Sequence, residues 1–78
     1  MVLLRPDRAL ALIDEAEAAG VAVLGVDGFR LCPGGAIQPQ MEIDVDTEGE
    51  PDSWAAARSA VRNWASRPDQ AFEITLRS

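Results

Sequence analysis

The sequence predicts an α+β domain in which a small, mostly antiparallel β-sheet of three to four strands carries two helices on one face. Three observations predict this fold. Two stretches have apolar residues at helical spacing, several shorter stretches have the residue types of strands, and together they follow the order α-β-β-β-α-β. The chain has 78 residues. That length gives room for a single domain over residues 1–78.

The first predicted helix runs from Pro6 to Ala19. Pro6 suits the first helical position, Asp7 favours the positive end of the helix dipole, and Gly20 favours a left-handed stop. At about 100° per residue, the apolar residues share one face. They are Ala9, Leu12, Ile13, Ala16 and Ala19. We therefore expect an amphipathic helix that lays an alanine-rich face against a sheet.

Three stretches after this helix have the residue types of strands. Val21 to Val26 is a continuous apolar run typical of a buried strand, and Asp27-Gly28 after it predicts a turn. Phe29 to Cys32 alternates and predicts a second strand. Ile37 to Val45 predicts a third strand, in which Pro39 favours an edge position because proline cannot donate to a ladder.

A second helix is predicted from Ser53 to about Ser66, with Asp52 or Ser53 as its N-cap. Its predicted buried face comprises Trp54, Ala57, Val61, Trp64 and Ala65. The two tryptophans follow the spacing of the core stripe, and so we expect them, like Phe29, to be structural. The stretch Ala71 to Leu76 alternates, which predicts a last strand with Phe72, Ile74 and Leu76 on one side.

The charge of the chain limits its partners. The net charge is −6, and all seven cationic residues are Arg. Phosphates of nucleic acids and anionic lipids repel such a domain, which favours a basic protein partner instead. Met1 to Leu4 is too short an apolar run for a signal peptide or a membrane span. Cys32 is alone, and so the sequence predicts a cytoplasmic protein without disulfides.

The sequence does not predict an enzyme. It has no His, Tyr or Lys, which removes the commonest general base and the Schiff-base amine. Cys32 has no His to activate it, and Pro33-Gly34-Gly35 lacks the lysine and helix of a phosphate-binding loop. We expect no cofactor.

Residues 41–52, MEIDVDTEGEPD, place a carboxylate at every even-numbered position. On a strand, residues 42, 44 and 46 would project from one face at intervals of about 7 Å. Such a charged edge could simply resist aggregation, or it could bind a basic partner. The candidate partner-binding residues are Glu42, Asp44, Asp46, Glu48 and Glu50. Arg30, on a neighbouring strand, could contact the partner or neutralise some of these acids internally, and we expect the internal role.

The same stretch partly matches a calcium loop. From Asp44 to Ala55, oxygen-bearing residues stand at the first, third, fifth and ninth places, and Gly49 stands at the sixth. However, Ala55 occupies the twelfth place, which requires a bidentate Glu, and Pro51 occupies the eighth. Weak calcium binding by residues 44–52 is therefore an alternative, and we predict no specific metal site.

Four segments, which together span residues 23–76, are VLGVDGFRL, IQPQMEIDVD, SWAAARSAVRNW and FEITL. In these segments the sequence resembles a family of small cytosolic immunity proteins of bacterial toxin systems. The resemblance implies a protein-binding inhibitor that neutralises a cognate toxin, often a basic nuclease, by presenting carboxylates where phosphates would lie. The alternative is a small structural or oligomerising acidic domain, for example a homodimer, without a toxin partner.

Overall fold

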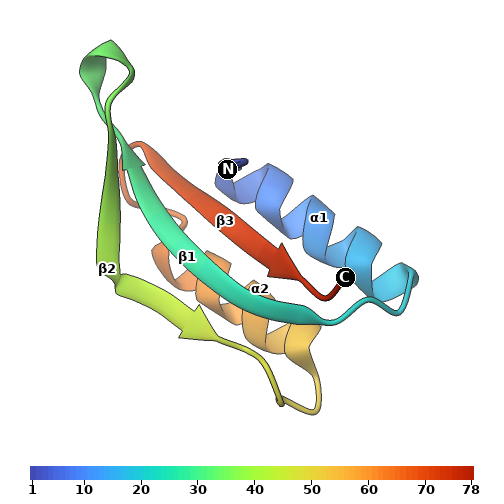
Figure 1. The fold of residues 1–78 in the computed structure, drawn as a ribbon. Helices are drawn as coiled ribbons and strands as arrows, with labels where there is room; N and C mark the ends of the chain where they lie inside the picture. The colour runs from blue at the N-terminus through green and yellow to red at the C-terminus, as the bar shows by residue number, and fades with distance from the viewer.

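The computed structural model describes residues 1–78 and contains two α-helices and a three-stranded sheet. All neighbouring strands are antiparallel, in the order β2-β1-β3 (Figure 1). The elements, in chain order, are α1 (Pro6–Ala18), β1 (Val23–Leu31), the 3₁₀ turn η1 (Pro33–Gly35), β2 (Ile37–Asp46), α2 (Ser53–Trp64) and β3 (Gln70–Leu76). The predicted α+β class and antiparallel sheet are confirmed.

Both helices cover the same face of the sheet (Figure 1). They form one hydrophobic core with it, made of Ala9, Ile13, Val23, Val26, Ile43, Ala57, Ala60, Val61 and Phe72. The two tryptophans are half-buried and pack against this core, as the helical spacing predicts. One expected core position is wrong: Ala19 lies just beyond the end of α1 and is exposed. Neither helix has the length and apolar character needed to cross a membrane.

The predicted turn at Asp27-Gly28 is wrong, because β1 runs straight through it as one strand. The glycine has another purpose. Asp27 lies opposite Asp44 but Gly28 lies opposite Gln40, and so residues 41–43 of β2 form a bulge. A Cβ added to Gly28 would lie 2.5 Å from the Cβ of Ile43. Glycine therefore allows Ile43 to pack directly over β1, and the sheet has three strands because two predicted ones are joined.

Side chains of the loop after β2 and of α2 hold the start of β1. A second bulge between Val23 and Gly25 interrupts the pairing with β3 there. The hydroxyl of Ser53 accepts the Val23 N–H at 3.0 Å, and the hydroxyl of Thr47 donates to the Val23 carbonyl at 2.7 Å. Both hydroxyl residues are buried. They satisfy backbone groups that the buried strand start would otherwise leave unpaired.

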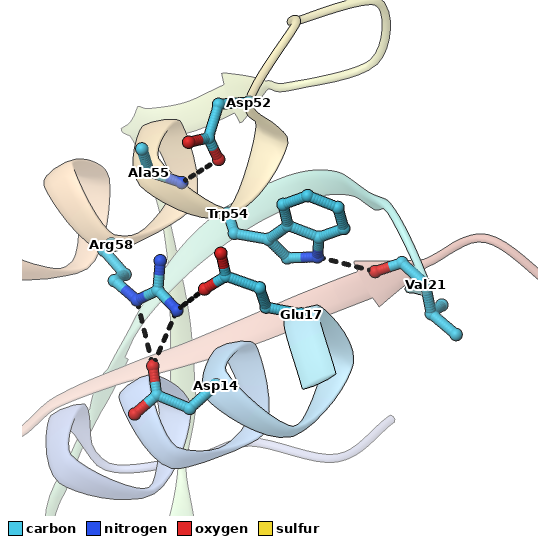
Figure 2. Close-up of polar contacts among 7 residues, drawn as sticks. All are labelled: Asp14, Glu17, Val21, Asp52, Trp54, Ala55 and Arg58. Carbon is cyan, nitrogen blue, oxygen red and sulfur yellow. Dashed lines mark hydrogen bonds and ion pairs between the residues drawn. The ribbon is translucent and has the colours of Figure 1, made fainter. Parts of the chain in front are cut away.

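The two helices are joined by polar contacts (Figure 2). Arg58 of α2 pairs with Asp14 at 2.8 Å and with Glu17, both on α1. These bonds to Glu17 and Asp14 raise the pKa of Arg58 above its ordinary value. The indole nitrogen of Trp54 donates to the Val21 carbonyl at 2.8 Å, which ties α2 to the segment before β1.

The start of α2 follows the prediction. The carboxylate of Asp52 accepts the Ala55 N–H at 2.9 Å, and so Asp52 is the N-cap (Figure 2). The helix ends at Trp64, somewhat before the predicted Ser66.

Strand β2 is an edge strand, as Pro39 predicts. The backbone N–H of Cys32 donates to the Ala36 carbonyl at 2.8 Å at the hairpin end of the ladder. Pairs with and without ladder hydrogen bonds alternate along an antiparallel ladder. Counting from the bonded pair of Cys32 and Ala36, Phe29 and Pro39 form a pair without ladder hydrogen bonds, and the proline nitrogen points away from β1. The proline therefore costs no hydrogen bond within the sheet.

Candidate protein-binding surface

The face of the sheet opposite the helices carries four carboxylates, on all three strands. Val26 is part of the helix-side core, and so the adjacent Asp27 projects to the other face. Asp27 lies directly opposite Asp44 on β2 and Glu73 on β3, and opposed residues project from the same face. Asp46, two residues after Asp44, lies opposite Gly25 and joins them. We call Asp27, Asp44, Asp46 and Glu73 the acidic face.

Asp27 and Asp44 form one of the closer types of cross-strand pair. Thr47 donates its N–H to the Leu24 carbonyl at 3.1 Å, which makes the Asp27–Asp44 pair one without ladder hydrogen bonds. Such pairs have Cα atoms about 4.5 Å apart, nearer than hydrogen-bonded pairs. Burial raises the pKa of Asp27, as do a hydrogen bond to Asp44 and the charges of Asp44 and Glu73. The acidic face thus gathers negative charge at some cost in free energy.

No cation of the chain pairs with the acidic face. The ion pairs of the structure involve only Arg58, with Asp14 and Glu17, and Arg67, with Glu42. The acidic face is also free of covering helices, because both pack on the opposite side of the sheet (Figure 1). It therefore presents negative charge that the fold itself does not neutralise.

Glu42 does not belong to this surface, although we expected it to project beside Asp44 and Asp46. The bulge at residues 41–43 breaks the alternation, so that Gln40 and Asp44 project from opposite faces despite both being even-numbered. Glu42 accepts a hydrogen bond from Arg67 at 2.9 Å and lines a cavity with Gln40. The bond to Arg67 lowers the pKa of Glu42 below its usual value.

Arg30 also differs from its prediction. It lies on β1, next to β2, but forms no ion pair with the acids, and it lines the cavity that contains Glu42 and Arg67. Arg67, which follows α2, neutralises Glu42 instead. No local sequence pattern links residues 42 and 67, because the tertiary fold brings them together.

Glu48 and Glu50 lie in the exposed turn after β2, outside the acidic face. The Glu48 N–H donates to the Asp46 carboxylate at 2.9 Å, and the Glu50 N–H donates to the Thr47 carbonyl at 3.2 Å. These two acids extend the negative charge from the end of β2 into the turn. Of the five candidate residues, the structure therefore brings only Asp44 and Asp46 together on the sheet.

Residues 44–52 do not have the geometry of a calcium-binding loop. Nowhere does the structure gather three or more acidic or cysteine side chains into a group that could hold a metal ion. Asp52 points its carboxylate at the N-terminus of α2, and Asp46 points one oxygen at the Glu48 N–H. One carboxylate oxygen of Asp46 and one of Asp52 thus accept hydrogen bonds from the local backbone.

Asp27 and Glu73 are the two members of the acidic face that sequence reasoning missed. Because Asp-Gly is a strong turn signal, the sequence predicts that Asp27 lies in a turn. Glu73 stands between Phe72 and Ile74 in an alternating strand, and so its position opposite the core was available from the sequence. What the sequence could not supply was the register that places both acids beside Asp44.

The sequence matches no known protein family and no curated protein.

Proposed function

We propose that the protein is a non-catalytic, immunity-type inhibitor whose acidic face binds and neutralises a basic cognate toxin. One observation carries the proposal: Asp27, Asp44, Asp46 and Glu73 lie together on an uncovered sheet face without any cationic partner. Lys and Arg side chains of a second protein would supply the missing positive charge. Glu48 and Glu50 would extend the interface along the adjoining turn.

The electrostatics of the whole chain support the same role. With a net charge of −6, the protein attracts a basic partner over distances of about a Debye length, roughly 8 Å at physiological salt. Such steering raises association rates and is weakened by added salt. If the toxin is a nuclease, carboxylates on the acidic face would occupy the positions of substrate phosphates. Inhibitor and toxin would meet in the bacterial cytoplasm, where the toxin is made.

The experiment is a comparison of three proteins used as bait in lysate of the source cell. They are the wild type, the double variant Asp44→Lys/Asp46→Lys, and the control Asp7→Lys/Glu15→Lys. The control changes the net charge equally, at exposed α1 positions outside the acidic face and outside every ion pair. Circular dichroism first establishes that all three are folded.

We expect the wild type and the control to retain one basic protein that the double variant loses. Producing that protein in a test bacterium should then arrest growth, and co-production of the wild type, but not of the double variant, should restore it. Equal retention by all three baits would place the interface elsewhere. Capture of a non-toxic protein would contradict the inhibitor role.

A further inference from the structure

We infer that the basic partner inserts an extended segment that pairs, as an additional strand, with the free edge of β2 at Asp44–Asp46. This inference rests on the proposed function and adds the mode of binding: main-chain hydrogen bonds along the edge, together with Lys or Arg side chains over the acidic face. Addition of a strand to an exposed sheet edge is a common way of recognising extended segments.

The backbone of this part of β2 has unpaired groups that point outward. The Thr47 N–H donates to the Leu24 carbonyl of β1. Inward and outward groups alternate along an antiparallel strand, and so Val45 pairs with Val26 while the N–H and C=O groups of Asp44 and Asp46 turn away from β1. β2 ends the sheet, and no strand lies beyond it. These outward groups are therefore free to pair with another chain.

Two other stretches of the sheet edges are less suited to a new strand. Pro39 has no N–H at its outward-facing position, and the bulge at residues 41–43 interrupts the edge of β2 before Asp44. On the far side of the sheet, Leu4 exchanges two backbone hydrogen bonds, at 2.7 and 2.8 Å, with Phe72 of β3. The segment Asp44–Asp46 thus combines a free, regular edge with the carboxylates of the acidic face.

The negative charge beside this edge favours a basic segment of a partner over a second copy of the chain. Side chains of an added strand would lie about 4.5–5.5 Å from the side chains directly opposite them on β2. Lys or Arg at alternate positions would then face Asp44 and Asp46, with Asp27 one strand further in. A second copy of the same chain would bring another net charge of −6 to the edge, which opposes self-pairing.

The test uses two ten-residue peptides of identical composition with the ¹⁵N-labelled full-length protein. One peptide alternates Lys and Thr, whereas the other has five Lys followed by five Thr. Both carry the same charge, but only the alternating peptide can place every Lys on one side of an added strand. Binding is titrated by NMR, and amide hydrogen exchange is measured with and without peptide.

In the free protein, the amide protons of Asp44 and Asp46 should exchange much faster than those of Val45 and Thr47. The alternating peptide should bind about five- to tenfold more tightly than the block peptide and should slow exchange at Asp44 and Asp46.

Equal binding of the two peptides without protection would overturn strand addition, yet leave the acidic face as an electrostatic binding surface. Binding of neither peptide would also overturn strand addition. The proposed function would still be decided separately by the lysate and growth experiments. Protection at Asp44 and Asp46 by the alternating peptide is the result that supports the inference.

Discussion

The two faces of the sheet are made by the same strands but have opposite chemistry. On the helix side, Val26, Ile43 and Phe72 are fully buried in one apolar core. On the other side, residues adjacent to these in the chain, Asp27, Asp44 and Glu73, lie together without a cation. Because neighbouring side chains along a strand alternate between faces, a single stretch of sequence encodes both a core and a charged surface.

This difference separates the stability of the fold from the partner binding that we propose for the acidic face. Burial of a large apolar side chain contributes about 1.5–3 kcal/mol, whereas opposing like charges on a sheet surface are destabilising by only about 0.2–1 kcal/mol. The helix side can therefore offset the cost of concentrating acids on the other side. Substitutions on the helix side should change the free energy of unfolding, and substitutions on the acidic face should mainly change partner binding.

The largest effect should come from Phe72→Ala on the helix side. Phe72 is fully buried, and truncation of a buried phenylalanine leaves a cavity that costs about 3–5 kcal/mol. Glu73→Ala, the matched control one residue later on the acidic face, should change stability by less than about 0.5 kcal/mol. Urea denaturation followed by circular dichroism measures both. Similar losses for the two variants would contradict the division between the faces.

A smaller effect should distinguish two glycines of β1. A Cβ at Gly28 would lie 2.5 Å from the Ile43 Cβ, whereas a Cβ at Gly25 would lie 3.4 Å from the nearest atom, the Val45 carbonyl oxygen. Gly28→Ala should therefore destabilise the protein by about 1–3 kcal/mol through overpacking, and Gly25→Ala should have little effect. Thermal unfolding of the two variants provides the comparison.

Thermal unfolding also tests whether Ile43, in the bulge of β2, packs over Gly28. If the Ile43 side chain packs over Gly28, Ile43→Ala should relieve part of the clash that Gly28→Ala creates. The double variant Gly28→Ala/Ile43→Ala should then lose less stability than Gly28→Ala and Ile43→Ala lose in sum. Strict additivity would indicate that Ile43 does not pack over Gly28.

Helices, class and edge position were predictable from the sequence because their signals are local. Pro6 and Asp52 mark the helix starts, the apolar stripes mark the buried faces, and Pro39 marks the edge strand. Asp27-Gly28 wrongly predicts a turn, because the same residues also suit a continuous strand that packs closely against a bulge in the neighbouring strand. The choice between them depends on Ile43, which lies distant in the sequence and fills the space over the glycine.

The candidate site was predictable only in part, because it also depends on contacts between segments that are distant in the sequence. Alternation correctly groups Asp44 with Asp46, but it fails across the bulge, and so it wrongly predicts that Glu42 projects beside them. Conversely, Asp27 and Glu73 join the acidic face through strand register, which is a property of pairing between segments. A sequence pattern within one strand cannot specify that pairing by itself.

The smallest predicted effect is the cost of the acidic face itself. The raised pKa of Asp27 means that the folded state binds more protons than the unfolded state at pH values just above 3.8, the ordinary value of the group. Stability from this group is therefore present at lower pH and lost as pH rises through the folded pKa. Asp27→Asn removes the charge and should stabilise the protein at about pH 7 by about 0.2–1 kcal/mol, with the difference vanishing near pH 3.

Glu42→Gln is the control of opposite sign for this pH dependence. The bond to Arg67 lowers the pKa of Glu42, and so its contribution is present above 4.5, the ordinary value, and is lost as pH falls through the folded pKa. The glutamine variant should be less stable than the wild type at about pH 7 and should approach it on acidification. Urea denaturation at both pH values measures the two variants together. If Asp27→Asn is stabilised and Glu42→Gln is destabilised, the bulge separates the mutually repelling carboxylates of the acidic face from the single, neutralised carboxylate of Glu42. Stability changes of the same sign in the two variants would contradict this separation.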